Sequence, residues 1–263
     1  MDLQLNNKKA LITGSTAGIG HAIAARLAQE GATVVLNGRE PDNLAVALKR
    51  IDEQAKKPAL GFSGDLSSPE AAEELFEKHP DVDILVNNLG AFRPEDFEDI
   101  SDETWRWFFE VNVLSGIRMA RYYLPRMRER DWGRVIFVSS ESGIHIPAEM
   151  VHYGMTKAAQ IAVARGLAES VSGTGITVNS VLPGPTQSRG VGLFMKGLAD
   201  SRGQNFEEFT SDFFREFRPT SIIQRFSTTD EVATMVAYLS SPLAAATTGA
   251  PIRVDGGVVR SAF

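Results

Sequence analysis

Short apolar runs alternate with longer amphipathic stretches from one end of the chain to the other. Continuous Val-, Ile- and Leu-rich runs without polar alternation predict strands that are buried on both faces. We expect strands at Lys9–Thr13, Thr33–Asn37, Ala59–Phe62, Ile84–Asn87, Arg134–Ser139, Thr177–Leu182 and Ile252–Val254. The longer stretches predict helices near Ile19–Glu30, Asp42–Ala55, Pro69–Lys78, Asp102–Arg128, Val151–Val171 and Thr229–Leu239.

This alternation is typical of repeated β-α units. We therefore predict a single α/β domain over residues 1–263, a Rossmann-type, doubly wound, seven-stranded parallel sheet with helices on both faces. Right-handed crossovers place the carboxyl ends of all strands along one edge, where such folds bind ligands. The stretch Arg189–Arg225 breaks the rhythm and has its own helical pattern, so we predict a substrate lid at about residues 189–225.

Composition narrows the possible partners. The 263 residues carry a formal net charge of -6, and the basic residues form no run, so nucleic acid and membrane are not expected partners. The chain has no cysteine and only four scattered histidines, and we predict no metal site. Met1 to Lys9 is polar, and no segment reaches the roughly 18 apolar residues that span a bilayer, which favours a cytoplasmic protein.

A glycine-rich turn follows the first predicted strand and leads directly into a helix. Glycines in such a turn allow a sharp bend and let backbone N–H groups approach a pyrophosphate. The alternative is a tight turn without a ligand. The dinucleotide-binding candidates are Gly14, Ser15, Thr16, Gly18, Ile19 and Gly20.

The second predicted strand ends in Asn37-Gly38-Arg39, at the place where NAD-binding folds usually carry an acidic residue for the ribose. A neutral residue followed by an arginine suits the 2′-phosphate of NADP, because a guanidinium binds phosphate through two hydrogen bonds. We therefore expect NADP (NADPH) as the preferred cofactor, with NAD possible. The alternative reading of Arg39 is a residue that simply faces solvent.

Candidate catalytic residues fall where the carboxyl edge of the sheet is expected. They are Asn112, the pair Ser139-Ser140, Tyr153 and Lys157. Positions four apart share one helix face, so the phenol and the ammonium group can point to the same place. A nearby ammonium group stabilises a phenolate and lowers the pKa of the phenol, which then exchanges a proton with a carbonyl or alcohol oxygen. A surface Tyr and Lys pair is the alternative.

The order of these residues resembles the short-chain dehydrogenase/reductase superfamily, and the 3-oxoacyl-reductase-like members in particular. The resemblance runs from about Lys8 to Gly257. It is carried by the Thr13–Gly20 turn, Asp65-Leu66, Asn87-Asn88-Leu89-Gly90, Asn112, Ser140, Tyr153, Lys157, Pro183-Gly184 and Val254-Asp255-Gly256-Gly257.

The resemblance implies roles for individual residues. It selects Ser140 over Ser139 as the serine that hydrogen-bonds the substrate oxygen, and Asn112 as a residue that holds a water. Lys157 would also bind the nicotinamide ribose. Further cofactor contacts would come from Asp65 and Leu66 beside the adenine, from Asn88 and Gly90, from Pro183 and Gly184, and from Thr186 or Ser188 at the carboxamide.

The lid decides the substrate, which we expect to be a small carbonyl or alcohol compound, bulky or apolar. Phenylalanines at helical spacing either pack inside the protein or contact such a substrate. They are Phe206, Phe209, Phe213 and Phe217, with Phe194 and Phe214 nearby; further pocket candidates are Phe92, Arg93, His145, Ile146, Met150 and Gln187.

The predicted helix Val151–Val171 is apolar around most of its circumference, more than one buried face requires, so another helix is expected to cover the rest. The resemblance implies that this helix forms a dimer face, and we expect a homotetramer, with a dimer as the alternative. The leading hypothesis is an NADP-dependent ketone or 3-oxoacyl reductase. The alternatives are an NAD-linked alcohol or sugar-acid dehydrogenase and a non-catalytic, cofactor-sensing protein of the same fold.

Overall fold

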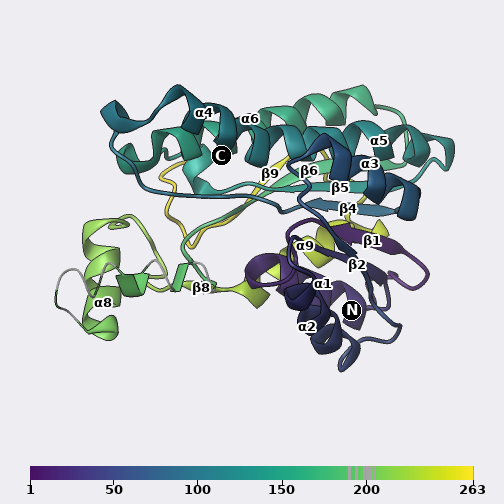
Figure 1. Ribbon diagram of the computed structural model, residues 1–263, viewed down its shortest axis with the longest axis horizontal. Coiled ribbons are helices and arrows are strands. Elements are labelled where there is room, and N and C mark those ends of the chain that lie inside the picture. Colours follow the sequence, from purple (N-terminus) through teal and green to yellow (C-terminus); the bar gives the residue numbers. More distant parts are fainter. Residues whose placement is uncertain (189–190, 193–194, 198, 200–202, 204, 263) are drawn as a thin grey trace.

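Seven parallel strands form the central sheet in a computed structural model of the chain (Figure 1). The structure describes residues 1–188, 191–192, 195–197, 199, 203 and 205–262. The strand order is β3-β2-β1-β4-β5-β6-β9, which confirms the predicted doubly wound sheet. The strands are β1 (Lys9–Ile12), β2 (Thr33–Gly38), β3 (Leu60–Ser63), β4 (Ile84–Asn87), β5 (Gly133–Val138), β6 (Ile176–Pro183) and β9 (Pro251–Val254).

Helices cover both faces of this sheet, as Figure 1 shows. One layer holds α1 (Gly18–Gln29), α2 (Pro41–Asp52) and α9 (Thr229–Ser240), and the other holds α3 (Pro69–Lys78), α5 (Ser115–Glu129) and α6 (Val151–Ser170). Alternate residues of β1 divide between the two cores: Ala10 and Ile12 join the first layer, and Leu11 joins the second. Burial on both faces explains why the strands lack polar alternation.

The predicted helix Asp102–Arg128 is not continuous. The structure divides it into α4 (Asp102–Phe109), a π-helical turn at Glu110–Leu114 and α5. Within the turn, the Ser115 hydroxyl donates to the carbonyl of Val111 at 2.6 Å. A π turn inserts an extra residue and changes which side chains face the sheet edge, and such turns often lie at functional sites. Asn112 lies in the middle of this one.

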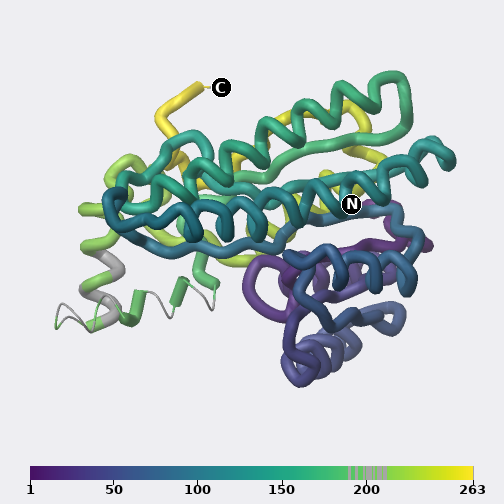
Figure 2. Tube along the Cα trace, turned by 45° about the horizontal axis from the view of Figure 1, so that its top comes forward, coloured from purple at the N-terminus to yellow at the C-terminus, as the bar shows by residue number. Residues whose placement is uncertain are grey.

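The remaining elements are short or lie outside the sheet. Single 3-10 turns occur at Phe97–Asp99, Glu141–Gly143, Ala148–Met150 and Pro242–Ala244, and β7 (Thr186–Gln187) pairs with β8 (Ser227–Thr228). Helix α8 (Phe206–Glu216) lies to one side of the sheet, as Figures 1 and 2 agree. Across the described ranges, every helix is too short or too polar to cross a lipid bilayer.

The phenylalanines predicted at helical spacing divide into two groups. Phe209 and Phe214 are buried, and Phe209 packs with Met195 in a small core of its own. Phe213 and Phe217 instead line a cavity. Packing and cavity lining therefore both occur in this segment. Phe194 and the side chain of Phe206 lie outside the described part of the chain.

Candidate active site

The glycine-rich turn between β1 and α1 has the backbone geometry that only glycine adopts easily. Gly14 and Gly18 have φ angles of +61° and +59°, in the left-handed region. Gly20 is needed for a different reason, because a Cβ there would collide with the side-chain amide of Asn88 and lie 2.7 Å from the Gly14 carbonyl. The turn thus packs tightly against the loop that follows β4.

The amino end of α1 opens from this turn and suits an anion. Ala17 is the residue that caps the amino end of α1, and within the described chain this cap has no side-chain hydrogen bond. The first turn of α1 carries no acidic residue. The first N–H groups of a helix have no partners inside the helix, and its dipole is positive at this end. A pyrophosphate fits such a site.

Two predicted cofactor contacts, Ser15 and Asn37, turn their side chains inward. The Ser15 hydroxyl donates to the Ile12 carbonyl at 2.7 Å and accepts from the Asn37 N–H at 2.9 Å. The Asn37 side chain accepts from the Gly14 N–H at 3.0 Å and donates to the carbonyls of Phe62 and Gly64. Both residues therefore shape the turn, and the ligand would meet the backbone they hold.

Asn88, directly after β4, also uses its side chain to hold the glycine turn. Its side-chain amide donates to the carbonyls of Thr13 and Gly14, both at 2.9 Å. The N–H groups of Asn88 and Leu89 both donate to the Thr13 hydroxyl, at 3.0 and 2.9 Å. The glycine turn is thereby fixed from both neighbouring strands.

The predicted adenine side lies at the ends of β2 and β3. Gly38 is closely covered by the Thr16 side chain, and Arg39 beside it is exposed. Asp65 is exposed, and its carboxylate accepts from the N–H and hydroxyl of Ser67. Leu66 is buried in the core, so its side chain stabilises the fold and only its backbone can face a ligand.

Two adjacent serines after β5 have different surroundings. The Ser139 hydroxyl donates to the Lys157 carbonyl at 2.8 Å and so points to the backbone of α6. Ser140 lines the cavity and hydrogen-bonds Tyr153, which lies in the first turn of α6. The structure thus brings Ser140 and Tyr153 together and directs the hydroxyl of Ser139 elsewhere.

The pKa of Tyr153 differs from the sequence-based expectation. Burial raises the pKa of this phenol above its ordinary value, and the nearby Glu141 carboxylate raises it further. The hydrogen bond with Ser140 and the positive charge of Arg218 lower the pKa, but by less. Tyr153 is therefore a protonated phenol at neutral pH, ready to donate.

Lys157 makes its hydrogen bonds away from the phenol. Its ammonium group donates to the Val138 carbonyl at 3.0 Å and to the Gln160 side chain at 3.1 Å, and lies 5.6 Å from the centre of the Tyr153 ring. Burial lowers the pKa of Lys157 to about 7. Without a bound anion nearby, its charge is only partly present at neutral pH.

Asn112 connects the loop after β4 to α6 through its side chain. The side-chain oxygen accepts from the Ala91 N–H at 2.7 Å, and the amide donates to the Ala91 carbonyl at 3.0 Å and the Thr156 hydroxyl at 2.9 Å. Its own backbone carbonyl accepts from the Gln160 amide at 2.5 Å. The side chain of Gln160 therefore lies between Asn112 and Lys157, where the sequence analysis expects a water.

A cavity of about 400 Å³ joins the phenol to the glycine turn. Ile19 lines it at the turn, Tyr153 and Ser140 line its side, and Phe213, Phe217 and Phe226 line it from the segment around α8. At the end of β6 it is lined by Pro183, Gly184, Thr186 and Ser188, so both predicted carboxamide partners border it.

The other predicted pocket residues divide between the cavity and the surface. Phe92 and Met150 line the cavity, and the Phe92 ring packs edge-on to Tyr153 at 6.3 Å between centroids. Arg93 forms an exposed ion pair with Glu95 at 2.5 Å. His145 and Ile146 are exposed, and Gln187 borders a separate groove beside α1.

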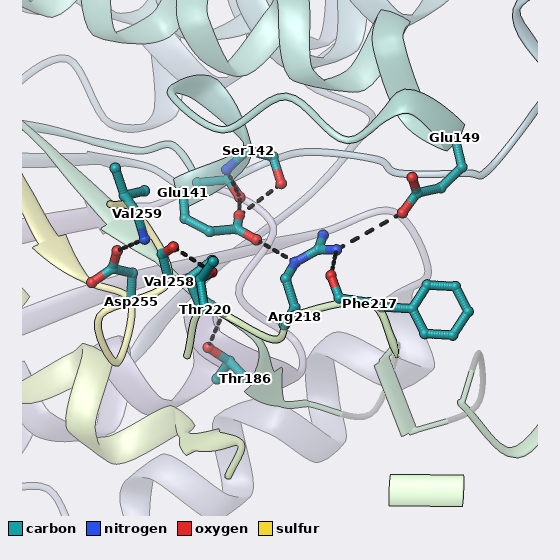
Figure 3. Close-up of polar contacts among 12 residues, drawn as sticks. Glu141, Ser142, Glu149, Thr186, Phe217, Arg218, Thr220, Asp255, Val258 and Val259 are labelled. Carbon is teal, nitrogen blue, oxygen red and sulfur yellow. Dashed lines mark hydrogen bonds and ion pairs between the residues drawn. The ribbon is translucent and has the colours of Figure 1, made fainter. Parts of the chain in front are cut away.

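Three residues near the site were missed by the sequence analysis: Glu141, Gln160 and Arg218. Glu141 and Arg218 form an ion pair at 3.0 Å, and both side chains are less than one-tenth exposed (Figure 3). The only sequence signal for Glu141 is its position directly after Ser140. Arg218 belongs to a phenylalanine-rich stretch, where its charge gives no hint that it is buried.

The residues that surround the cavity fit a dinucleotide with a nicotinamide ring. The open amino end of α1 suits the pyrophosphate, the glycine turn allows close approach, and the cavity extends from there to Tyr153. No group of three or more His, Cys, Asp or Glu side chains among the described residues has a metal-binding arrangement.

Comparison with known proteins agrees with this geometry. The model of the short chain dehydrogenase family matches residues 8–195. An uncharacterized oxidoreductase of Bacillus subtilis (strain 168), YvaG, is 47% identical over 264 residues, which is 100% of both chains. The 3-oxoacyl-[acyl-carrier-protein] reductase FabG of Aquifex aeolicus (strain VF5) is 31% identical, over 98% of this chain and 100% of the relative.

A solved structure matches the fold closely. The L-sorbose reductase of Gluconobacter frateurii, complexed with NADPH and L-sorbose, superimposes with a TM-score of 0.92 at 31% identity. The match covers 99% of this chain and 100% of the reductase.

Proposed function

The chain belongs to the short chain dehydrogenase family and is an NAD(P)-dependent oxidoreductase, and we propose that it reduces a neutral, largely apolar ketone or 3-oxoacyl compound with NADPH. The observation that carries this proposal is the phenol of Tyr153 beside Ser140 in an apolar cavity that begins at the glycine turn. Reduction needs a proton donor at the carbonyl oxygen, and a phenol is such a donor.

Each residue of the site has its own role in the proposed reaction. The reduced nicotinamide, when bound, supplies the hydride. Tyr153 donates the proton to the carbonyl oxygen, and Ser140 hydrogen-bonds that oxygen as its negative charge develops. Lys157 stabilises the phenolate that remains. Asn112 and Gln160 keep Lys157 and the loop after β4 in place, as their hydrogen bonds indicate.

The charges around the cavity favour a neutral substrate. Its charged lining residues, within the described part of the chain, are Glu141, Glu149 and Arg218. Arg218 pairs with Glu141 at 3.0 Å and lies 3.8 Å from Glu149, so the described lining residues offer no uncompensated cation to a substrate carboxylate. The phenylalanine rings supply apolar surface instead. We propose residues 189–225 as the substrate-determining lid of a single-domain enzyme, a range that lies partly outside the described residues.

Arg39 supports NADPH over NADH, because its exposed guanidinium group follows β2 where a 2′-phosphate would lie. The sorbose reductase complexed with NADPH agrees with this preference. The proposed assembly is a homotetramer. Trp107 and Phe109 on α4, which remain 49% and 37% exposed, suit a subunit interface. A cytoplasmic location stays a prediction from the sequence.

A substrate screen tests the proposal. The purified protein is mixed with NADPH or NADH and with neutral carbonyl compounds, among them ethyl acetoacetate, cyclohexanone and L-sorbose, and absorbance is followed at the nicotinamide band. We expect NADPH consumption with at least one neutral ketone. Tight NADPH binding without turnover on any carbonyl or alcohol compound would instead support a cofactor-sensing protein.

A further inference from the structure

A buried carboxylate lies next to the serine of the site. The Ser140 hydroxyl donates to the Glu141 carboxylate at 2.6 Å, and the Ser142 hydroxyl donates to the same oxygen at 2.7 Å. Only 3% of Glu141 is exposed to solvent. A carboxylate in this position needs a positive partner, because an unpaired buried charge costs several kcal/mol (about 3 to 5).

Arg218 provides that partner from a distant part of the chain. It lies after α8, and its Nε donates to the second oxygen of Glu141 at 3.0 Å (Figure 3). The same guanidinium group donates to the Phe217 carbonyl at 2.7 Å and lies 3.8 Å from the Glu149 carboxylate. The base of the α8 segment is thereby joined to the loop after β5 and to the turn before α6, as Figure 3 shows.

The proton of the Ser140 hydroxyl is already engaged in this arrangement. A serine hydroxyl has one proton to donate and two lone pairs that accept. Its proton goes to Glu141, because a carboxylate only accepts. Its oxygen accepts from the Ser142 N–H at 3.1 Å. To donate to a substrate oxygen, Ser140 must turn its proton away from Glu141.

Glu141 tolerates that change because Ser142 and Arg218 remain bonded to it. Its charge, however, stays beside the phenol that must become negative as it gives up a proton. The charged groups that face Tyr153 are Lys157 on α6 itself, Glu141 after β5, Glu149 before α6 and Arg218 after α8. Removal of Arg218 alone would leave two carboxylates near a developing negative charge.

We propose that Glu141 and Arg218 act as a pair of positioning residues: Glu141 holds the Ser140 hydroxyl until substrate arrives, and Arg218 neutralises Glu141 so that Tyr153 can release its proton. This inference rests on the proposed reductase function. It predicts that the damage from losing Arg218 comes mainly from the charge left on Glu141.

The test compares four proteins in ethyl acetoacetate reduction at saturating NADPH: Glu141→Gln, Arg218→Gln, the double variant and wild type. We expect Arg218→Gln to lower kcat by about tenfold to a hundredfold, with KM within about threefold of wild type. Glu141→Gln should lower kcat by less than about tenfold. The double variant should recover to within about threefold of Glu141→Gln, because the uncompensated charge is gone.

Recovery in the double variant separates this electrostatic role from a structural one. A structural role predicts a deficit that persists in the double variant, and that result would overturn the inference. Arg215→Gln is the matched control, because Arg215 forms an exposed pair with Asp212 on the same segment; its kcat should stay within about twofold of wild type.

Folding is checked by thermal melting and by NADPH affinity. If Arg218→Gln does not fold, Arg218→Lys replaces it: Lys keeps the charge but not the planar fork, so kcat should stay within about tenfold of wild type. If Arg218→Lys folds but its kcat is about a hundredfold below that of wild type, the charge-balance role is contradicted. If wild type and Arg215→Gln reduce none of the neutral carbonyl compounds of the screen, the reductase function itself is refuted, whereas active controls with an unrecovered double variant refute only the pairing.

Discussion

The positive charge of Lys157 destabilises the folded state, because only 4% of the residue is exposed to water. Burial lowers the pKa of its ammonium group to about 7, from 10.5 in an unfolded chain. Between these two values the unfolded state keeps the proton that the folded state has released. The unfolded state therefore binds more protons, and the free energy of unfolding should rise with pH in this window.

We predict that wild type gains up to about 1.4 kcal/mol of stability per pH unit from this group as pH rises above 7. Lys157→Met has no titrating group at this position. The free energy of unfolding of the variant minus that of wild type should therefore fall by roughly 2 kcal/mol between pH 7.5 and 9.5. Urea unfolding of the cofactor-free proteins measures this. Lys49→Met, at an exposed position on α2, is the control. Parallel pH curves for wild type and Lys157→Met would contradict the prediction.

The proposed preference for NADP depends on one side chain, the exposed Arg39 after β2. We predict that Arg39→Ala weakens NADPH binding by about tenfold to a hundredfold, because a charge-assisted pair with the 2′-phosphate is lost. NADH has no such phosphate, so its affinity should change less than about twofold. Titration of nicotinamide fluorescence gives both values. Arg50→Ala, a second exposed arginine on α2, should leave both affinities unchanged; equal affinity of wild type and Arg39→Ala for NADPH would remove the basis for NADP preference.

At the scale of elements, the π turn and α6 are joined by one buried side chain. Gln160 is 2% exposed, donates to the Asn112 carbonyl and accepts from Lys157. Its amide group thus joins a carbonyl of the π turn to a buried ammonium group. Loss of these bonds leaves buried polar groups with fewer partners.

We predict that Gln160→Met destabilises the protein by about 1 to 3 kcal/mol, the cost of those unpaired groups. It should also lower kcat, because Lys157 loses its fixed position. Gln54→Met is the matched control, since Gln54 bonds only at the surface among the described contacts, and it should change stability by less than about 0.5 kcal/mol. Chemical denaturation that ranks the two variants equally would show that Gln160 is not a structural link.

Helices and strands could be predicted where the residues that form them are neighbours in the sequence. Each central strand is a continuous apolar run, and the glycine turn needs residues that adjoin it in sequence, so the sheet and the start of α1 were predicted correctly. The π turn depends on the bonds of Asn112 to residues 21 and 44 positions away. Glu141 and Arg218 are separated by 77 positions. No local pattern reports such pairs, and the raised pKa of Tyr153 follows from this distant packing.

At the scale of the whole molecule, the fold brings an apolar wall and a proton donor to one edge of the sheet. The strand ends supply the glycine turn and Ser140, α6 supplies Tyr153, and the segment around α8 supplies Phe213 and Phe217. Because Arg218 is already paired, this wall has little attraction for an anionic substrate. Substrate choice is therefore a property of the assembled cavity.

We predict that ethyl acetoacetate is reduced with a kcat/KM at least about tenfold higher than acetoacetate, because the free carboxylate finds no unpaired cation. Phe213→Ala should raise KM for the ester by removing apolar contact. Phe97→Ala, at an exposed position outside the cavity lining, should leave KM unchanged. Initial rates at saturating NADPH give these values, and a preference for acetoacetate would refute the neutral-substrate proposal.

The account depends most on the proton that Tyr153 donates. Single-turnover reduction of a neutral ketone identified in the screen, by wild type and Tyr153→Phe with bound NADPH, tests this directly. We predict that the variant binds NADPH within about threefold of wild type but oxidises it at least about a hundredfold more slowly, since removing the general acid alone costs about 10² to 10⁴ in rate. Oxidation of NADPH by Tyr153→Phe at a rate near that of wild type would contradict the account.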